Sequence, residues 1–263
     1  MPPEAEIDVE YARSAPGDAL KALVHDAREG ILLALLENPN LEEPHVTALL
    51  ARLDLSAQVV AAIGEKAAWA AHENVRLALA RHPRTPRRIA LAMARQLFLF
   101  DLARLSLLPS APADIRRAAE EMILARVPHL PVGEKLTLAR RGPARVAGAL
   151  LAEGHPQAIK LALDNAHLTE SQVLKALAKL GVPARSVAAI AQHRKWSRLY
   201  NVRVALVRNS STPVPAMLTF LPDVTLRDLR DLAGLETLPP HVRRYIQREL
   251  RRRSGPTGKQ ARA

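Results

Sequence analysis

The sequence contains no cysteine, and aromatic residues make up only 3% of its 263 residues. The lack of cysteine excludes disulfide bonds, thiolate zinc sites, cysteine-ligated iron–sulfur clusters and cysteine nucleophiles. It also fits a reducing compartment, and we expect a cytoplasmic protein. The scarcity of aromatics argues against β-sandwiches and barrels. Hydrophobic residues make up 48% and are mostly Leu, Ala, Val and Ile, so helices are favoured.

Several motifs of targeting and catalysis are also missing. The first ten residues are acidic and contain proline, unlike the basic start and apolar run of a signal peptide. No uncharged apolar run reaches the roughly 18 residues of a membrane span. There is no Walker loop, dinucleotide glycine fingerprint or nucleophile elbow, and the nine histidines show no zinc-binding spacing. We therefore expect no catalytic residue, no cofactor and no metal.

Acidic residues are scarce after residue 73. The formal net charge is +12, yet residues 1–73 hold 5 basic and 13 acidic residues, against 33 and 13 in the remainder. Such asymmetry is typical of a polyanionic partner or of contact between two halves. The alternative is compositional, because arginine outnumbers lysine and alanine is abundant, as in a GC-rich coding sequence.

A Leu- and Ala-rich phrase recurs four times along the chain. The last Leu of each copy is Leu35, Leu79, Leu163 or Leu206, with spacings of 44, 84 and 43 residues. The middle spacing is about two periods, and residues 135–142 resemble a degenerate copy lying between. A period of about 43 residues is that of a HEAT or armadillo unit.

The turns after these phrases carry helix-start residues. At Thr85-Pro86 and Thr212-Pro213, we expect the threonine hydroxyl to cap the next helix and proline to occupy its first position. Thr169 and Gln172 form a predicted capping box. The apolar stripe from Val173 to Leu180 predicts a helix that Gly181 ends.

Together these patterns predict an all-α fold. We expect a right-handed α-solenoid of about five HEAT-like helix-pair repeats, because each pair buries its apolar face only by stacking on the next. Residues 1–20 form an N-terminal arm or cap in this prediction, and 21–253 a single solenoid domain. Residues 254–263 are expected to be a disordered basic tail.

The Asn-Pro and Thr-Pro turns followed by Leu-rich helices resemble the bacterial variant leucine-rich repeat and HEAT-like superfamily. The resemblance covers residues 31–250 and is one of repeat style. It implies a curved helical scaffold that binds macromolecules. One member type of the variant repeat group carries a cysteine-ligated iron–sulfur cluster, which does not carry over to a chain without cysteine.

The densest basic cluster lies in residues 81–88, at a predicted turn between helices. Arg81 and Arg84 flank the turn, and Arg87 and Arg88 begin the next helix. Several guanidinium groups beside exposed helix N–H groups suit phosphate binding. The alternative is an arginine-rich turn that only faces solvent.

Residues 193–200 place cations beside two of the few aromatics, Trp196 and Tyr200. The cations are Arg194, Lys195 and Arg198. This mixture suits base stacking with phosphate contact, or a cation–π anchor at a protein interface. Alternatively, Trp196 and Tyr200 share one helix and fill the gap between repeats. Trp69 occupies the matching place before the second phrase, which favours packing.

Further basic residues lie near the ends of predicted helices. They are Arg140 and Arg141 at the end of the degenerate copy, Arg208 in the fourth phrase, and Arg243 and Arg244 in the last helix. Cations at a helix C-terminus stabilise the helix dipole, so capping explains Arg140 and Arg141 without a ligand. The alternative is a basic ridge of Arg81, Arg141 and Arg208, which occupy similar relative positions. Arg243 and Arg244 belong either to a polyanion-binding tail or to a solubilising C-terminal cap.

Our leading functional hypothesis is a non-enzymatic scaffold that binds another macromolecule, foremost a protein. The alternative is DNA or RNA binding through an arginine-rich face, including an enzyme similar to the HEAT-like DNA glycosylases. The nucleic-acid hypothesis predicts one continuous face formed by Arg81, Arg84, Arg141, Arg194, Arg208 and the C-terminal arginines.

Overall fold

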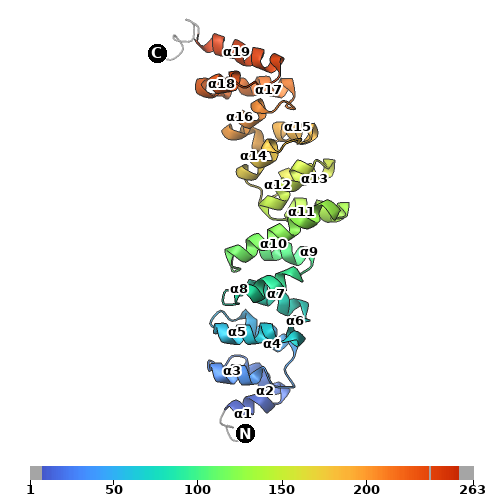
Figure 1. The fold of residues 1–263 in the computed structure, drawn as a ribbon, viewed down its shortest axis with the longest axis vertical. Coiled ribbons are helices and arrows are strands. Elements are labelled where there is room, and N and C mark those ends of the chain that lie inside the picture. Colours follow the sequence, from blue (N-terminus) through green and yellow to red (C-terminus); the bar gives the residue numbers. More distant parts are fainter. Residues whose placement is uncertain (1–7, 237, 255–263) are drawn as a thin grey trace. The chain divides into compact units, whose positions relative to one another are not determined.

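The computed structural model describes residues 8–236 and 238–254 and confirms the all-α class, with no strand in these ranges (Figure 1). The first helices are α1 (Val9–Ser14), α2 (Gly17–Leu23), α3 (Glu29–Leu35), α4 (Glu43–Ala51), α5 (Ala57–Glu65), α6 (Ala67–Ala70), α7 (Glu73–Arg81), α8 (Arg87–Arg95), α9 (Leu99–Leu107) and α10 (Ala113–Arg126). They are followed by α11 (Val132–Arg141), α12 (Ala144–Glu153), α13 (Pro156–Leu163), α14 (Glu170–Ala178), α15 (Ala184–Gln192), α16 (Tyr200–Arg208), α17 (Val214–Phe220), α18 (Leu226–Ala233) and α19 (Pro240–Ser254). None of these helices is long and apolar enough to cross a membrane.

The chain divides into two compact units, residues 1–126 and 127–263, and the solenoid domain predicted for residues 21–253 includes parts of both. Part of the predicted N-terminal arm is helical, since α1 and the start of α2 lie in it and both helices pack on α3. Ser254 belongs to α19, and the rest of the predicted tail lies outside the described residues.

The two units are copies of one another at an offset of 127 residues. Without any gap, 37 of the 115 residues in 12–126 are identical in 139–253. The offset pairs α4 with α14, α7 with α16 and α10 with α19. It is close to three of the predicted periods, and it matches Leu36, rather than Leu35, with Leu163. Positions that agree and positions that differ between the units can therefore be compared within one chain.

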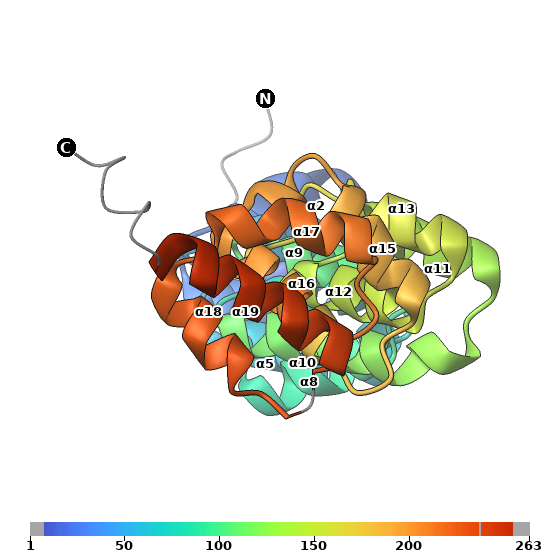
Figure 2. The same ribbon diagram turned by 90° about the horizontal axis from the view of Figure 1, so that it is seen from above.

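Within each unit the helices pack in two rows. In what we call row A, α7 packs on α4 and α9, and α14 on α12 and α16. In row B, α3 packs on α1 and α5, and α13 on α11 and α15. The 127-residue offset assigns α18 to row A and α19 to row B, and they lie side by side in Figure 2. Short loops make consecutive helices antiparallel, so the C-terminal ends of the two rows lie at opposite edges of a unit.

Asparagine side chains join the end of one helix to the next repeat. The Asn38 amide donates to Ala12 O at 2.9 Å and Ala15 O at 3.1 Å, at the end of α1. Asn165 repeats this at the end of α11, donating to Ala139 O at 2.8 Å and Gly142 O at 3.0 Å. Carbonyls at a helix end have no intrahelical partner, so these bonds complete the helix and fix the stacking of neighbours.

The threonines after the phrases act differently from the prediction. The Thr85 hydroxyl donates to Leu79 O at 2.7 Å, and Thr212 donates to Leu206 O at 2.6 Å. Each therefore closes the preceding helix, while Pro86 and Pro213 are the N-cap residues of α8 and α17. The predicted threonine caps are wrong because the free carbonyl of the helix behind lies within reach. Thr169 is the N-cap of α14, but without a side-chain capping bond.

The two tryptophans occupy equivalent places with different burial. Trp196 lies in a 3₁₀ helix (Trp196–Arg198), is 1% exposed and donates from Nε1 to Leu163 O at 2.9 Å. Trp69 lies in α6 and is partly exposed. Trp196 is thus a packing residue, as its recurrence predicted. The prediction that it shares a helix with Tyr200 is wrong, because Tyr200 begins α16 and is exposed.

His82 takes the place that Asn209 has in the second unit. Its Nδ1 accepts the Arg84 N–H at 3.2 Å, so Nε2 carries the proton and donates to Arg52 O at 2.8 Å. Asn209 likewise accepts the Ser211 N–H and donates to Leu177 O. The bond that Nδ1 accepts requires the neutral ring. Burial foremost lowers the pKa of His82, the bond to Arg52 O opposes this, and Arg84 and Arg81 add to the lowering.

A pH-dependent contribution to stability follows for the first unit. A lowered folded-state pKa means that the His82 contribution is present above the unfolded pKa of about 6.5 and is lost as pH falls below it. We expect His82→Asn to keep the fold and to flatten the dependence of the melting temperature on pH between 7 and 5. Melting curves of both proteins at each pH measure this. Equal losses in both would contradict the role given to His82.

Candidate binding surfaces

An open groove runs along row A of the second unit, between α14 and α16. It has a volume of about 900 Å³, and its apolar lining includes Leu174, Leu177 and Val204. The loops that follow α14 and α16 form one end, with Lys179 and Arg208, and Tyr200 and Asp228 also line it. The groove therefore combines an apolar floor with two cations at one end.

Leu180, in the loop after α14, is 99% exposed. It was predicted to belong to the apolar stripe of the helix, which is wrong because α14 ends at Ala178. Gly181 then adopts a left-handed backbone with φ of +72°, which turns the chain away. The equivalent residue of the first unit, Leu53, is 63% exposed. Both units thus keep a solvent-facing leucine at the same place.

The first unit has a smaller groove at the equivalent position. Its volume is about 490 Å³, and its lining includes Leu77, Arg81 and Arg104. Arg81 corresponds to Arg208 at the 127-residue offset. In both grooves an asparagine joins neighbouring helices, from Asn74 to Glu43 at 2.8 Å and from Asn201 to Glu170 at 2.9 Å. The repeated Asn–Glu bonds hold the walls, whereas Arg81 and Arg208 form no ion pair within residues 8–236 and 238–254.

A tyrosine–aspartate pair lines the other end of the second groove, and a pair of carboxyls occupies the equivalent place in the first unit. In the second unit the Tyr200 hydroxyl donates to Asp228, and this bond foremost lowers the pKa of Asp228. At the equivalent place of the first unit, Glu73 shares a hydrogen bond with Asp101, which raises the pKa of Glu73. The aspartate is common to both units, and its partner has changed from a carboxyl to a phenol.

The predicted cluster at residues 81–88 does not form one anion site. Arg81 lines the groove of row A, whereas Arg87 pairs with Asp114 at 2.8 Å and Arg88 with Glu65 at 3.6 Å. Arg84 is exposed in the turn. These guanidinium groups point to different neighbours because the turn lies between a row A helix and a row B helix.

Five of the predicted residues meet at one edge of the second unit, where row B helices end. Arg140 and Arg141 end α11, and Arg194, Lys195 and Arg198 follow α15. Arg251, near the C-terminal end of α19, extends the same edge. We call these six residues the basic edge. Lys195 Nζ lies 4.1 Å from the centre of the Trp196 ring, a cation–π contact.

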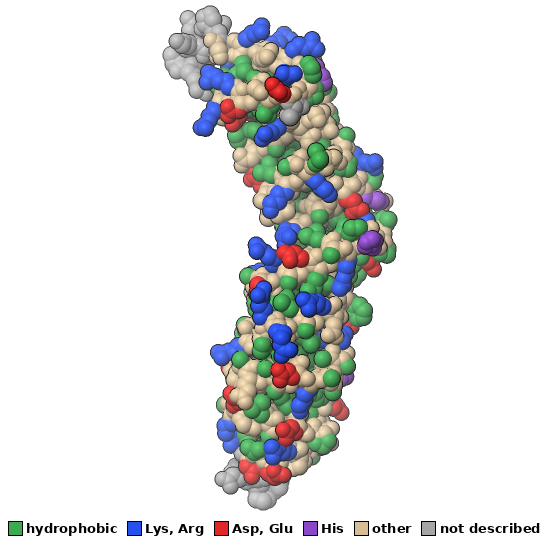
Figure 3. Space-filling model, viewed as in Figure 1, with side chains coloured by type: hydrophobic (Ala, Val, Ile, Leu, Met, Phe, Trp, Pro, Cys, Tyr) green, Lys and Arg blue, Asp and Glu red, His purple; other side chains and the backbone are tan. Residues whose placement is uncertain are grey.

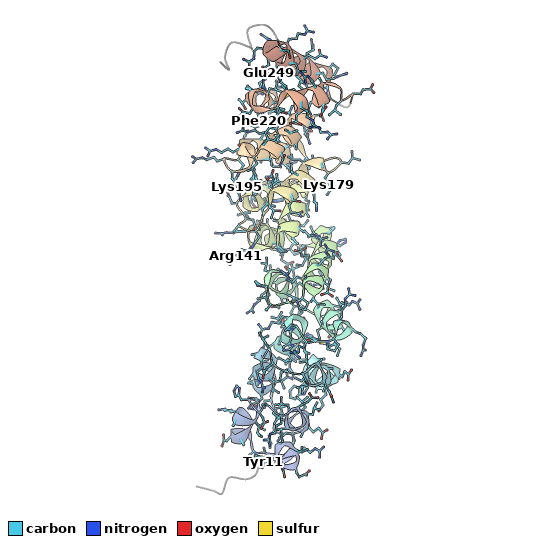
Figure 4. All side chains as sticks on the ribbon, turned by 90° about the vertical axis from the view of Figure 1, so that its left-hand side faces the viewer. Tyr11, Arg141, Lys179, Lys195, Phe220 and Glu249 are labelled. Atoms are coloured by element: carbon cyan, nitrogen blue, oxygen red, sulfur yellow. The ribbon has the colours of Figure 1, made fainter. Side chains whose placement is uncertain are left out.

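Arg208, Arg243 and Arg244 lie elsewhere. Arg208 ends a row A helix, and Arg243 and Arg244 lie in the first turns of α19, far along the helix from Arg251. Figure 4 accordingly shows Arg141 and Lys195 on one side of the second unit and Lys179 on the other. The single continuous arginine face is therefore wrong, because antiparallel rows place their C-terminal ends at opposite edges.

The sequence predictions missed Lys179 and the exposed state of Leu53 and Leu180. The 127-residue offset would have drawn attention to these positions, since it aligns one leucine with the other and Lys179 with Arg52. Among the described residues no group of three His, Asp or Glu side chains could hold a metal ion. No protein-family model, curated protein or solved structure matches the chain.

Proposed function

We propose that this chain is a non-enzymatic scaffold, a right-handed α-solenoid of HEAT-like helix pairs, that binds segments of a partner protein in its row A grooves. The exposed leucine carries the proposal, because Leu53 and Leu180 are retained while most residues differ between the units. Solvent exposure of a large apolar side chain gives up the stabilisation of burial, about 2 kcal/mol for a leucine. Its retention is typical of an interaction site.

The chemistry of the second groove indicates its partner. An apolar side chain fits between Leu174, Leu177 and Val204, and Leu180 would cover it. Lys179 and Arg208 at the end of the groove favour a carboxylate beside that side chain. We therefore expect a segment with a Leu or Phe next to Asp or Glu.

Fluorescence anisotropy with labelled peptides tests this function. Peptides that combine Leu or Phe with neighbouring Asp are expected to bind, and versions with Lys in place of Asp are not. Arg208→Glu should weaken binding at least about tenfold, or 1.4 kcal/mol. Leu180→Asp should weaken it similarly, because the exposed leucine then no longer supplies apolar contact.

Arg185→Glu is the matched control, since it makes the same charge change on α15 of row B. The affinity of this variant for the peptide should stay within about twofold of the wild-type affinity, because exposed charges far from the groove interact only weakly with the peptide. If Arg185→Glu and Arg208→Glu lowered the peptide affinity equally, the loss would come from the change in net charge and not from the groove. Binding that survives both Arg208→Glu and Leu180→Asp would refute the groove as the site.

A further inference from the structure

The positive charge of the chain belongs to the second unit. Residues 1–126 hold 15 basic and 17 acidic residues, whereas residues 127–263 hold 23 and 9. In Figure 3 the visible face over the C-terminal helices shows far more Lys and Arg than Asp and Glu. A purely compositional cause acts on both copies alike, so it does not explain a difference between them.

The turn around the tryptophan shows where the copies diverged. Trp69 is surrounded by Ala67, Ala68 and Ala71, all of which are exposed. At the equivalent places, Trp196 is surrounded by Arg194, Lys195 and Arg198. Since the first unit folds the equivalent segment, as the short helix α6, with alanine at these places, the fold does not require the three cations.

Hydrogen bonds connect this turn to the rest of the edge. Asn165 bonds the end of α11, which carries Arg140 and Arg141. Trp196 bonds Leu163 O, just before Asn165, and so places the turn beside the end of α13. Arg203 joins the turn to the segment that follows α17. Its guanidinium donates to Ser197 O at 2.7 Å and also to the carboxylate of Asp223.

The last helix completes the edge. Arg253 donates to Val224 O at 2.7 Å, which places the C-terminal end of α19 beside the end of α17. Arg126 makes the equivalent bond to Leu97 O in the first unit. The six residues of the basic edge therefore lie at neighbouring helix ends that hydrogen bonds hold together, all within the second unit.

The cations of the edge are not neutralised by the protein. Of the acids beside them, Asp223 pairs with Arg203 and Glu249 with Arg252, and Asp164 forms a hydrogen bond with His193. Within the described ranges the six cations of the edge form no ion pair. At the six equivalent positions of the first unit, Arg13 is the single cation, and it pairs with Glu10 and Glu37. The second unit thus presents an uncompensated row of charge where the first does not.

We propose that the basic edge binds the phosphate backbone of double-stranded nucleic acid, an activity separate from the protein-binding grooves. Guanidinium groups favour phosphate oxygens, and helix ends in series suit a repeating backbone. Trp196 is buried and its Nε1–H is occupied, so the edge offers no aromatic platform for unpaired bases. Of the large exposed apolar residues of the described chain, only Leu218 lies near a helix end of the edge, in the last turn of α17, and a single apolar side chain disfavours insertion into a membrane surface.

Anisotropy with a short fluorescent DNA duplex tests the proposal. The variant Arg194→Ala, Lys195→Ala, Arg198→Ala reproduces the alanines of the first unit and should stay folded, as circular dichroism would verify. Because the variant loses three phosphate contacts, it should bind the duplex about 10- to 100-fold more weakly than the wild type at salt concentrations from 50 to 200 mM. The lost contacts should also reduce the slope of log K against log salt by about 2 to 3.

The matched control is Lys175→Ala, Arg227→Ala, Arg230→Ala, which removes three exposed cations from row A helices. It should retain nearly the full affinity and salt slope. Equal losses in the two triple variants would overturn the assigned edge, and unchanged binding by the first would do the same. No binding of duplex at 50 mM salt, tighter binding of single strands, or preference for phosphatidylserine vesicles would each overturn the nucleic-acid proposal. Loss of peptide binding in Arg208→Glu with intact duplex binding would show that the two surfaces act independently.

Discussion

Trp196→Ala is expected to lower the free energy of unfolding of the second unit by about 3–5 kcal/mol. Trp196 is the largest of the fully buried side chains. Its removal leaves a cavity and deprives Leu163 O of the Nε1–H donor. That carbonyl ends α13, so the loss also loosens the stacking between α13 and the turn after α15. Hydrogen exchange of residues 156–198 measures the change within this unit.

Trp69→Ala provides the matched control in the first unit. Trp69 is partly exposed. The carbonyl equivalent to Leu163 O is Leu36 O, which accepts a hydrogen bond from Lys66 Nζ at 2.5 Å and not from the tryptophan. The cost should therefore be smaller, about 1–2 kcal/mol. Trp196→Phe separates volume from hydrogen bonding, because it keeps most of the ring and loses the donor. Equal destabilisation by Trp69→Ala and Trp196→Ala would contradict the difference in burial.

Asn165→Asp is expected to destabilise the second unit by at least about 3 kcal/mol at pH 7. Asn165 is 2% exposed, and its amide N–H groups donate to Ala139 O and Gly142 O. Aspartate would place a carboxylate against these two carbonyl oxygens, so both lose their donor and the charge is buried. The pKa of the introduced carboxyl should rise in the folded state. The penalty should therefore shrink as pH falls towards 4, the sign for a group that folds best when protonated.

Urea unfolding of the wild type and the variant at pH 7 and pH 4.5 measures this difference. Asn209→Asp is the matched comparison, because Asn209 is only partly buried and donates to a single carbonyl, Leu177 O at 3.1 Å. It should cost clearly less than Asn165→Asp. A penalty that is independent of pH would show that Asn165 does not act as a buried donor.

Much of the fold could be predicted from local patterns. The Leu- and Ala-rich phrases predicted the helices, and their spacing gave a period of about 43 residues that fits three times into each unit. The recurrence of tryptophan predicted packing, and Trp196 is indeed buried. These successes share a cause, because helix propensity and apolar periodicity depend on residues only a few positions apart.

The helix-end chemistry could not be predicted in the same way. Thr85 and Thr212 were predicted to cap the helices that follow, and instead they close the helices behind them. A hydroxyl can donate or accept, and only the position of a free carbonyl decides which. The Asn38 and Asn165 bonds span more than twenty residues in the sequence, so local patterns carry no information about them.

The sequence by itself determined the all-α class, the repeat and the imbalance of charge, because composition and periodicity are properties of the chain. The 127-residue duplication was also present in the sequence, although the comparison of helix pairs revealed it. Only the tertiary structure decided which cations act together. Because neighbouring helices pack antiparallel, Arg208 lies at one edge of the second unit, and Arg141 and Lys195 lie at the other. Cations that look alike in the sequence therefore belong to separate surfaces.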